Sequence, residues 1–294
     1  MLQKADLLQL TRRLFRLCIN IALTFILILM SLSIKSPALP KSIAYSFVRE
    51  TAKKDIEFKT RDWNSLRDKQ FFLKYQEQDA DKIDLVLDTI KMDFEKVNEI
   101  LDYSDESKVP IVVYPNSESL GKSFGWDADE SAMGVYWAGV IRILSPNEWL
   151  DDDLSDDKAK EKFRKNGPMV HEYAHLVVDY RTRGNYTRWF TEGIAQLIEK
   201  EITGFQFDNV ALETDKSDWY DFKHMDRDFD KLPNQSLAYS QSLLMIEWLV
   251  DQYGYQGLNT ILNNLGTGKT LNQAFQIATG KTLRQFEEIS KTSY

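Results

Sequence analysis

The sequence has few of the residues that most often bind metals or form cross-links: among 294 residues there are one cysteine and three histidines. The cysteine, Cys18, lies in an apolar segment near the N-terminus, so no disulfide can form within the rest of the chain. A domain of more than about 200 residues can bury enough apolar surface to fold without disulfides. With no cysteine outside this segment, a zinc site in the rest of the chain would draw on the three histidines and on carboxylates.

The sequence also lacks a concentrated region of positive charge. Its 37 lysines and arginines face 45 aspartates and glutamates, which gives a net charge of −8. Because no basic stripe compensates for this excess, the sequence argues against a general nucleic-acid-binding protein. There is no internal repeat and no low-complexity tract. The apolar content of 43% and the charged content of 28% are ordinary for a folded protein, so we expect one large domain or two small ones.

Residues 17–34 form a long stretch without charge close to the N-terminus. At about 1.5 Å per residue, a helix of this length approaches the thickness of the hydrocarbon core of a bilayer. The positive charge is heavier before the stretch than after it, which predicts a cytoplasmic N-terminus. We therefore expect a cytoplasmic tail at 1–16, a transmembrane anchor or uncleaved signal at 17–34, and the remainder outside the cytoplasm. The alternative is a secreted protein whose signal peptide is cleaved near Ser36-Pro37-Ala38.

Beyond this segment, the hydrophobic pattern predicts strands first and helices afterwards. We expect a stalk at 35–68, because Pro37 and Pro40 interrupt a helix and little periodicity follows. The predicted strands are 71–75, 109–114 and a hairpin or one bent strand over 135–144, with a helix over 79–101. After an acidic loop at 151–157, the predicted helices are 158–181, 187–202, 237–253 and three shorter segments. This order predicts an α+β domain at 69–294, with a small mixed sheet and helices at 69–157 and a mostly helical part at 158–294.

The most informative feature is the segment His171-Glu172-Tyr173-Ala174-His175. Residues four apart lie on the same face of a helix, so the two imidazoles can share one metal ion. Glu172 projects close enough to act on a water bound to that metal. Pro168 fits the first turn of this helix, and Gly184 fits its end. A pair of ordinary core histidines is the alternative, but it gives no reason for the glutamate between them.

Two histidines do not complete a catalytic zinc site, which usually takes three protein ligands and a water. Glu192, in the segment Trp189–Ala195, is the best candidate for the third ligand. The 16 residues between His175 and Glu192 allow a second helix to return antiparallel to the first. Gly193 carries no side chain and so permits close approach to a neighbouring helix. A solvent-exposed carboxylate at the start of a helix is the alternative for Glu192.

These segments, together with Ala238-Tyr239-Ser240-Gln241-Ser242, resemble the motifs of the gluzincin zinc metallopeptidases, most nearly the peptidase MA-like domain. The similarity covers residues 71–290. It implies a zincin-like helical part that carries the active-site helix and one zinc ion bound by His171, His175 and Glu192. It also implies that Glu172 is the general base and suggests that Tyr239 stabilises the oxyanion. His224 is the other candidate for the last role, although a histidine in such a segment is more often simply exposed.

The chain departs from the family pattern at Gln196, four residues after Glu192, where many gluzincins have an acidic residue that orients a histidine ligand. Its amide oxygen could accept a hydrogen bond from an imidazole, but without charge.

The sequence thus predicts a zinc-dependent peptidase acting on peptides or proteins outside the cytoplasm. An endopeptidase is favoured over an aminopeptidase, because Gly134 stands where the aminopeptidases have a glutamate after Gly-Ala-Met. Residues 135–144 are then a candidate edge for pairing with substrate. The alternative is a membrane-tethered, non-catalytic binding or scaffold module that retains a structural or vestigial metal site.

Overall fold

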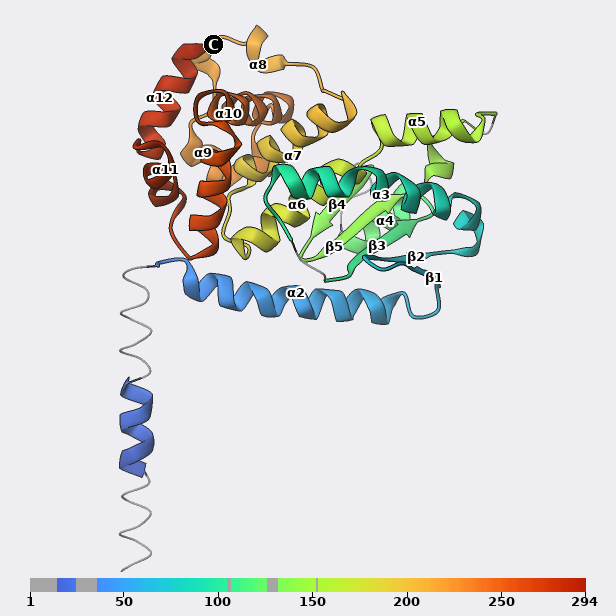
Figure 1. Cartoon of the computed structure of the whole chain (residues 1–294), viewed down its shortest axis with the longest axis horizontal. Coiled ribbons are helices and arrows are strands. Elements are labelled where there is room, and N and C mark those ends of the chain that lie inside the picture. Colours follow the sequence, from blue (N-terminus) through green and yellow to red (C-terminus); the bar gives the residue numbers. More distant parts are fainter. Residues whose placement is uncertain (1–14, 25–35, 105–106, 126–131, 152) are drawn as a thin grey trace, which may run out of the picture.

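The computed structural model describes residues 15–24, 36–104, 107–125, 132–151 and 153–294 (Figure 1). Its sheet has the strand order β1-β2-β3-β5-β4, with β2, β3 and β5 parallel and both edge strands antiparallel to their neighbours. The strands are β1 (Asn64–Arg67), β2 (Phe71–Tyr75), β3 (Val109–Tyr114), β4 (Gly134–Trp137) and β5 (Val140–Leu144). β5 is buried along its whole length, whereas β4 forms one edge of the sheet.

The segment 135–144 is a hairpin and not a single bent strand. Trp137 pairs with Val140, and the turn between them is Ala138-Gly139, in which both residues have positive φ. A two-residue turn of this kind matches the right-handed twist of paired strands. The predicted strands 71–75 and 109–114 agree with β2 and β3.

The C-terminal half is almost entirely helical, so the predicted α+β class is confirmed. The N-terminal half contributes α3 (Ile83–Ile100) and α4 (Ser117–Phe124) beside the sheet. The helices that follow are α5 (Asp156–Asn166), α6 (Met169–Thr182), α7 (Arg188–Thr203), α8 (Val210–Glu213), α9 (Phe222–Asp228), α10 (Gln235–Gly266), α11 (Leu271–Thr279) and α12 (Leu283–Ser293). The helix predicted over 158–181 is divided at Gly167-Pro168 into α5 and α6, and α10 changes direction at Gly254, where φ is 65° and ψ is 176°.

Helices α6, α7 and α10 pack side by side and form the core of the helical half (Figure 1). The apolar stripe predicted on α6 is buried, including Tyr173, Val177 and Val178. α7 lies against both neighbours, and its Gly193 faces the backbone of α10: a Cβ at this position would lie 2.3 Å from the carbonyl oxygen of Ser242. A side chain at Gly193 would therefore force the two helices apart.

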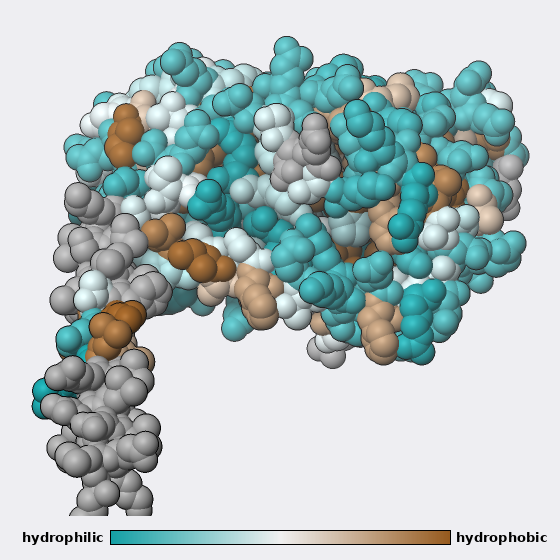
Figure 2. Space-filling view, turned by 60° about the horizontal axis from the view of Figure 1, so that its bottom comes forward, coloured by the Kyte–Doolittle hydropathy of each residue, from teal (hydrophilic) through white to brown (hydrophobic). Residues whose placement is uncertain are grey.

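The region expected to be a stalk, 35–68, contains β1 and the long helix α2 (Leu39–Lys59), which runs along the domain (Figure 1). α2 buries Ser42, Arg49, Ala52 and Ile56. The Nε atom of Arg49 lies 3.3 Å from the fully buried Asp179 carboxylate of α6. On this face of the molecule, a few apolar side chains, some of them next to one another, lie among hydrophilic ones (Figure 2). α2 is thus packed on the domain and does not merely precede it.

The predicted single-pass membrane location is contradicted, because no helix in the described part of the chain is both long and apolar enough to cross a membrane. Of the predicted anchor, residues 17–24 are helical, while 25–34 lie outside the described residues. The predicted tail, 1–16, is described only at its last two positions. α2 is long enough to span, but charged residues including Glu50, Lys53 and Lys54 occur throughout it.

Candidate metal centre

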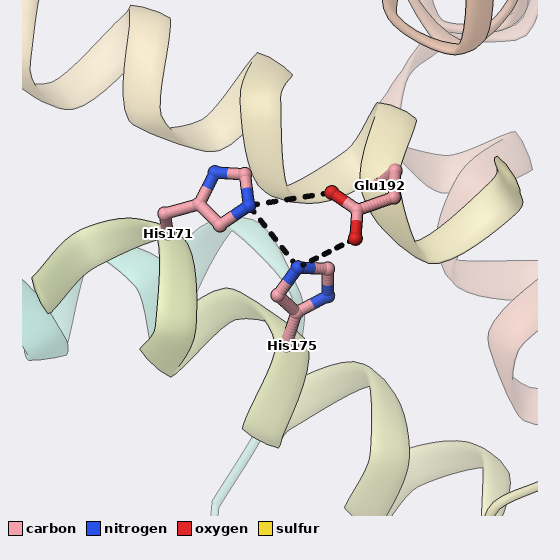
Figure 3. A group of neighbouring side chains, drawn as sticks. All are labelled: His171, His175 and Glu192. Atoms are coloured by element: carbon pink, nitrogen blue, oxygen red, sulfur yellow. Dashed lines mark hydrogen bonds and ion pairs between the residues drawn. The ribbon is translucent and has the colours of Figure 1, made fainter. Parts of the chain in front are cut away.

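α6 and α7 bring the three predicted ligands, His171, His175 and Glu192, to one point (Figure 3). The ligand atoms of these residues all lie within 4.8 Å of one another. The two Nε2 atoms are 3.1 Å apart. Glu192 Oε2 lies 3.4 Å from Nε2 of His171, and Oε1 lies 3.5 Å from Nε2 of His175. Among the described residues, these three side chains are the one group of histidines, cysteines and carboxylates close enough together to share a metal ion.

In each imidazole, Nδ1 is the nitrogen that faces away from the cluster, and it is hydrogen-bonded to a residue of α7. His171 Nδ1 lies 3.1 Å from Glu199 Oε2, and His175 Nδ1 lies 2.7 Å from Thr191 Oγ1. A carboxylate can only accept, so Nδ1 of His171 donates to Glu199, and in the neutral ring its Nε2 is left with a lone pair. If His175 donates to Thr191 in the same way, two lone pairs face each other beside a carboxylate. Such an arrangement is suited to a cation.

The charges around the cluster also favour a bound cation. Burial lowers the pKa of His171, but the carboxylates of Glu199 and Glu192 outweigh it and raise this pKa well above its usual value. Burial alone would raise the pKa of Glu192, yet Arg188, at 2.7 Å from Oε1, and His175 hold it well below its usual value. The negative potential that favours a proton on His171 also favours a metal ion.

The surroundings of Glu192 Oε2 indicate more directly whether these residues fit a metal ion. Only 1% of the Glu192 surface is exposed, and among the described residues no donor is hydrogen-bonded to Oε2, whose nearest ring nitrogen is Nε2 of His171 at 3.4 Å. A buried carboxylate oxygen without a hydrogen bond is costly. A cation placed between it and the two Nε2 atoms would supply the missing partner. Two imidazoles and one carboxylate form a usual donor set for catalytic zinc, so the residues fit.

Glu172 lies on the same helix with its carboxyl group in a different environment. Its Oε2 accepts a hydrogen bond of 2.5 Å from the backbone N–H of Tyr136 in β4. Burial raises the pKa of Glu172 to about 7. A carboxyl group with a pKa near 7 can both accept and release a proton at neutral pH. Gly134 allows the start of β4 to come this close, because a Cβ there would lie 2.9 Å from Cγ of Glu172.

A cavity of about 620 Å³ opens beside the cluster. It lies between the start of β4, the start of α6, the segment joining α7 to α8, and the start of α10. His171, Glu172 and Tyr239 all lie on its wall. The cavity thus brings the predicted base and one predicted ligand, both on α6, together with a hydroxyl group from α10.

The two candidates for oxyanion stabilisation lie in different places. Tyr239 lines the cavity, and its hydroxyl group lies 3.5 Å from Nη2 of Arg188. Burial, and then the charge of Glu192, raise the pKa of Tyr239 above its usual value. His224 is exposed on α9, where its Nδ1 lies 2.8 Å from Asp221, and it does not line the cavity. The geometry therefore favours Tyr239.

Gln196 stands at the position of the acidic residue that the resemblance to the gluzincins indicates, but it contacts neither histidine of the cluster. Its amide donates to the backbone oxygens of Glu192 and Tyr239, at 3.2 Å and 3.0 Å. Glu199, seven residues after Glu192, contacts the histidine instead. The sequence analysis missed Glu199, although seven residues are two helical turns and so return to the same face. It also missed Arg188, which lies one turn before Glu192, and Tyr136, whose contact depends on the tertiary fold.

Comparison with known proteins places the helices of the cluster within a family match. Residues 159–293 match the family model described as Peptidase MA superfamily, which supports a peptidase MA-like domain in this part of the chain. The chain is also similar to a Bacillus subtilis (strain 168) protein described as "Uncharacterized protein YhcO". The two are 24% identical over 246 residues, which cover 77% of this chain and 70% of the relative. The match includes α6, α7 and α10, which carry all the residues of the cluster and Tyr239.

Proposed function

Starting from a peptidase MA-like domain at 159–293, we propose that the protein is a zinc-dependent peptidase that hydrolyses internal peptide bonds. The observation that carries this proposal is the cluster of His171, His175 and Glu192 with Glu172 on the same helix and on the wall of the adjoining cavity. The substrate would be a peptide or an unfolded segment of a protein.

His171 and His175 would hold the zinc ion through their Nε2 atoms, and Glu192 through Oε2. The bound ion would supply polarisation of the scissile carbonyl and a lowered pKa for a water molecule, to about 7. Glu199 and Thr191 fix which nitrogen of each imidazole faces the ion, because each occupies the opposite nitrogen. Arg188 keeps Glu192 ionised, as a ligand must be.

Glu172 would move the proton. The N–H of Tyr136 holds Oε2, which leaves Oε1 to take a proton from the attacking water. The same carboxyl group would then deliver the proton to the nitrogen of the departing amine.

Tyr239 would stabilise the negative charge that develops on the carbonyl oxygen. Because its pKa is raised, its hydroxyl group stays protonated and can donate. The contact with Arg188 holds the hydroxyl on the side of the cluster.

The edge strand β4 supports an extended peptide as substrate. Among the described strands β4 pairs only with β5; the outward N–H of Tyr136 is held by Glu172, while Met133 and Gly134 at the start of β4 line the cavity. A peptide added along this edge would use backbone hydrogen bonds and so would not depend on a free terminus. This favours an endopeptidase.

The proposal is tested with purified full-length protein and its Glu172→Gln variant. We expect about one zinc per chain in both proteins by elemental analysis. Glu172→Gln should lower cleavage of casein by at least about 100-fold, because it removes the proton acceptor and leaves the ligands in place. Wild-type protein without zinc would contradict the proposal, as would an active Glu172→Gln variant. Zinc bound by a wild type that cleaves nothing would instead support a non-catalytic binding module.

A further inference from the structure

Two phenylalanines line the cavity beside the metal cluster. Phe205 and Phe207 lie in the segment between α7 and α8, and their rings meet edge to face with centroids 4.8 Å apart. Phe205 is half-buried, whereas Phe207 is 58% exposed. A phenylalanine that only stabilises the fold is usually buried in the core. Core packing therefore does not explain the exposed ring of Phe207.

The backbone places this aromatic pair at the cavity. α7 ends at Gly204, which has a φ of 75° and turns the chain, and the N–H of Phe205 then donates to Thr203 Oγ1 at 3.1 Å. Val210, at the start of α8, continues the apolar wall. The pair follows directly on the helix that carries Glu192 and Glu199.

We propose that Phe205, Phe207 and Val210 form a subsite for a large apolar side chain of the substrate, with aromatic side chains preferred. This inference rests on the proposed peptidase function. The occupant follows from the continuity of the cavity: the wall that carries these residues also carries His171 and Glu172. A peptide positioned for hydrolysis there would place a neighbouring side chain against the phenylalanines, whose rings favour apolar and aromatic partners.

Besides Glu172, two carboxylates line the cavity and raise the alternative of a basic side chain. Glu199 is already bound to His171, so its charge is directed to the cluster. Asp208 is exposed to solvent, where its attraction for a lysine would be weak. The aromatic pair therefore sets the preference, and a lysine-containing substrate serves as the test of the alternative.

The experiment uses blocked hexapeptides Ala-Ala-Ala-Xaa-Ala-Ala in which Xaa is Phe, Leu, Ala or Lys. With the full-length, zinc-containing protein, we expect kcat/KM for the Phe peptide to exceed that for the Ala peptide by roughly 10- to 100-fold. Phe207→Ala should reduce this ratio by roughly tenfold, because it removes one face of the subsite. Mass spectrometry of the products shows on which side of Xaa the bond is cleaved.

Phe58→Ala is the matched control, because Phe58 is similarly exposed, at 66%, but lies on α2 and not on the cavity wall. It should leave the ratio unchanged. A second measurement does not depend on turnover: the Glu172→Gln protein should bind the Phe peptide more tightly than the Ala peptide by calorimetry, and adding Phe207→Ala should remove the difference. Equal treatment of Phe and Ala, a preference for Lys, or a ratio unaffected by Phe207→Ala would overturn the subsite. Absence of cleavage with selective binding of the Phe peptide would instead count against the peptidase activity alone.

Discussion

The Nδ1 atom of each histidine in the cluster is hydrogen-bonded to a residue of α7: Glu199 for His171 and Thr191 for His175. A hydrogen bond to Nδ1 decides that Nε2 faces the cluster, and a carboxylate partner makes the imidazole a stronger ligand than an uncharged partner does. The two histidines therefore differ, since only His171 has a charged partner. Metal affinity should depend more on Glu199 than on Gln196, the position that the family pattern indicates.

Removal of the Glu199 carboxylate, which contacts Nδ1 of His171, should weaken metal binding. We expect Glu199→Gln to lower zinc affinity by roughly 10-fold and Glu199→Ala by up to roughly 100-fold, because the outer partner of His171 is weakened or lost. Competition against a fluorescent zinc chelator measures the change. Glu161→Gln on the neighbouring α5, an exposed position, is the control and should have no effect. Equal affinities in Glu199→Ala and the wild type would show that His171 does not need this partner.

At the scale of elements, α2 is joined to the active-site helix through a buried ion pair. Arg49 contacts both the carboxylate and the backbone oxygen of Asp179, and the hydroxyl group of Tyr136 donates to the same carboxylate. Asp179 lies one turn beyond His175, and Tyr136 is also the residue whose N–H holds Glu172. β4 and α6 are thus connected at two points through Tyr136. Its N–H holds Glu172, the proposed base, and its hydroxyl group contacts Asp179, which is also paired with Arg49 of α2.

The sequence does not reveal this role of α2, and the reason is physical. Of its four buried residues, Ser42 and Arg49 are polar, so the helix has no continuous apolar stripe to recognise. α6, by contrast, buries most of its residues and could be predicted from periodicity and from its end signals. Packing through a buried ion pair depends on a partner distant in the chain, which a periodic pattern does not contain.

Replacement of Arg49 should destabilise the domain in a way that depends on pH. Arg49→Met leaves Asp179 buried without its cation, so we expect a loss of roughly 3–5 kcal/mol in the free energy of unfolding at pH 8. Burial already raises the pKa of Asp179 above its usual value, and loss of Arg49 raises it further. The folded variant then binds a proton that the unfolded chain releases, so the loss should shrink as the pH falls toward 5.

Urea unfolding at several pH values measures this effect. Lys59→Met, which is also on α2, is the control, because Lys59 pairs with the exposed Asp55 and should contribute little to stability. A loss in Arg49→Met that is independent of pH, or one no larger than in the control, would show that the pair with Asp179 is not what holds α2.

At the scale of the whole molecule, the metal cluster could be predicted from the sequence and the cavity could not. His171 and His175 meet because their spacing is a property of any helix, and Glu192 follows once α7 returns along α6. The cavity requires β4, α6 and α10 together with the α7–α8 connection, so its wall becomes visible only in the folded chain. The N-terminal anchor was predicted from the uncharged run at 17–34 and its basic flank, but no helix among the described residues is long and apolar enough to cross a membrane.

The most direct test of the proposed zinc site is anomalous diffraction at the zinc edge from crystals of the wild-type protein grown with zinc. We predict one strong peak bounded by Nε2 of His171, Nε2 of His175 and Oε2 of Glu192, at distances of about 2.0–2.2 Å from each. Such a peak would identify the metal and its three ligands together. A zinc ion bound elsewhere, or no peak at these three residues, would contradict the proposed site.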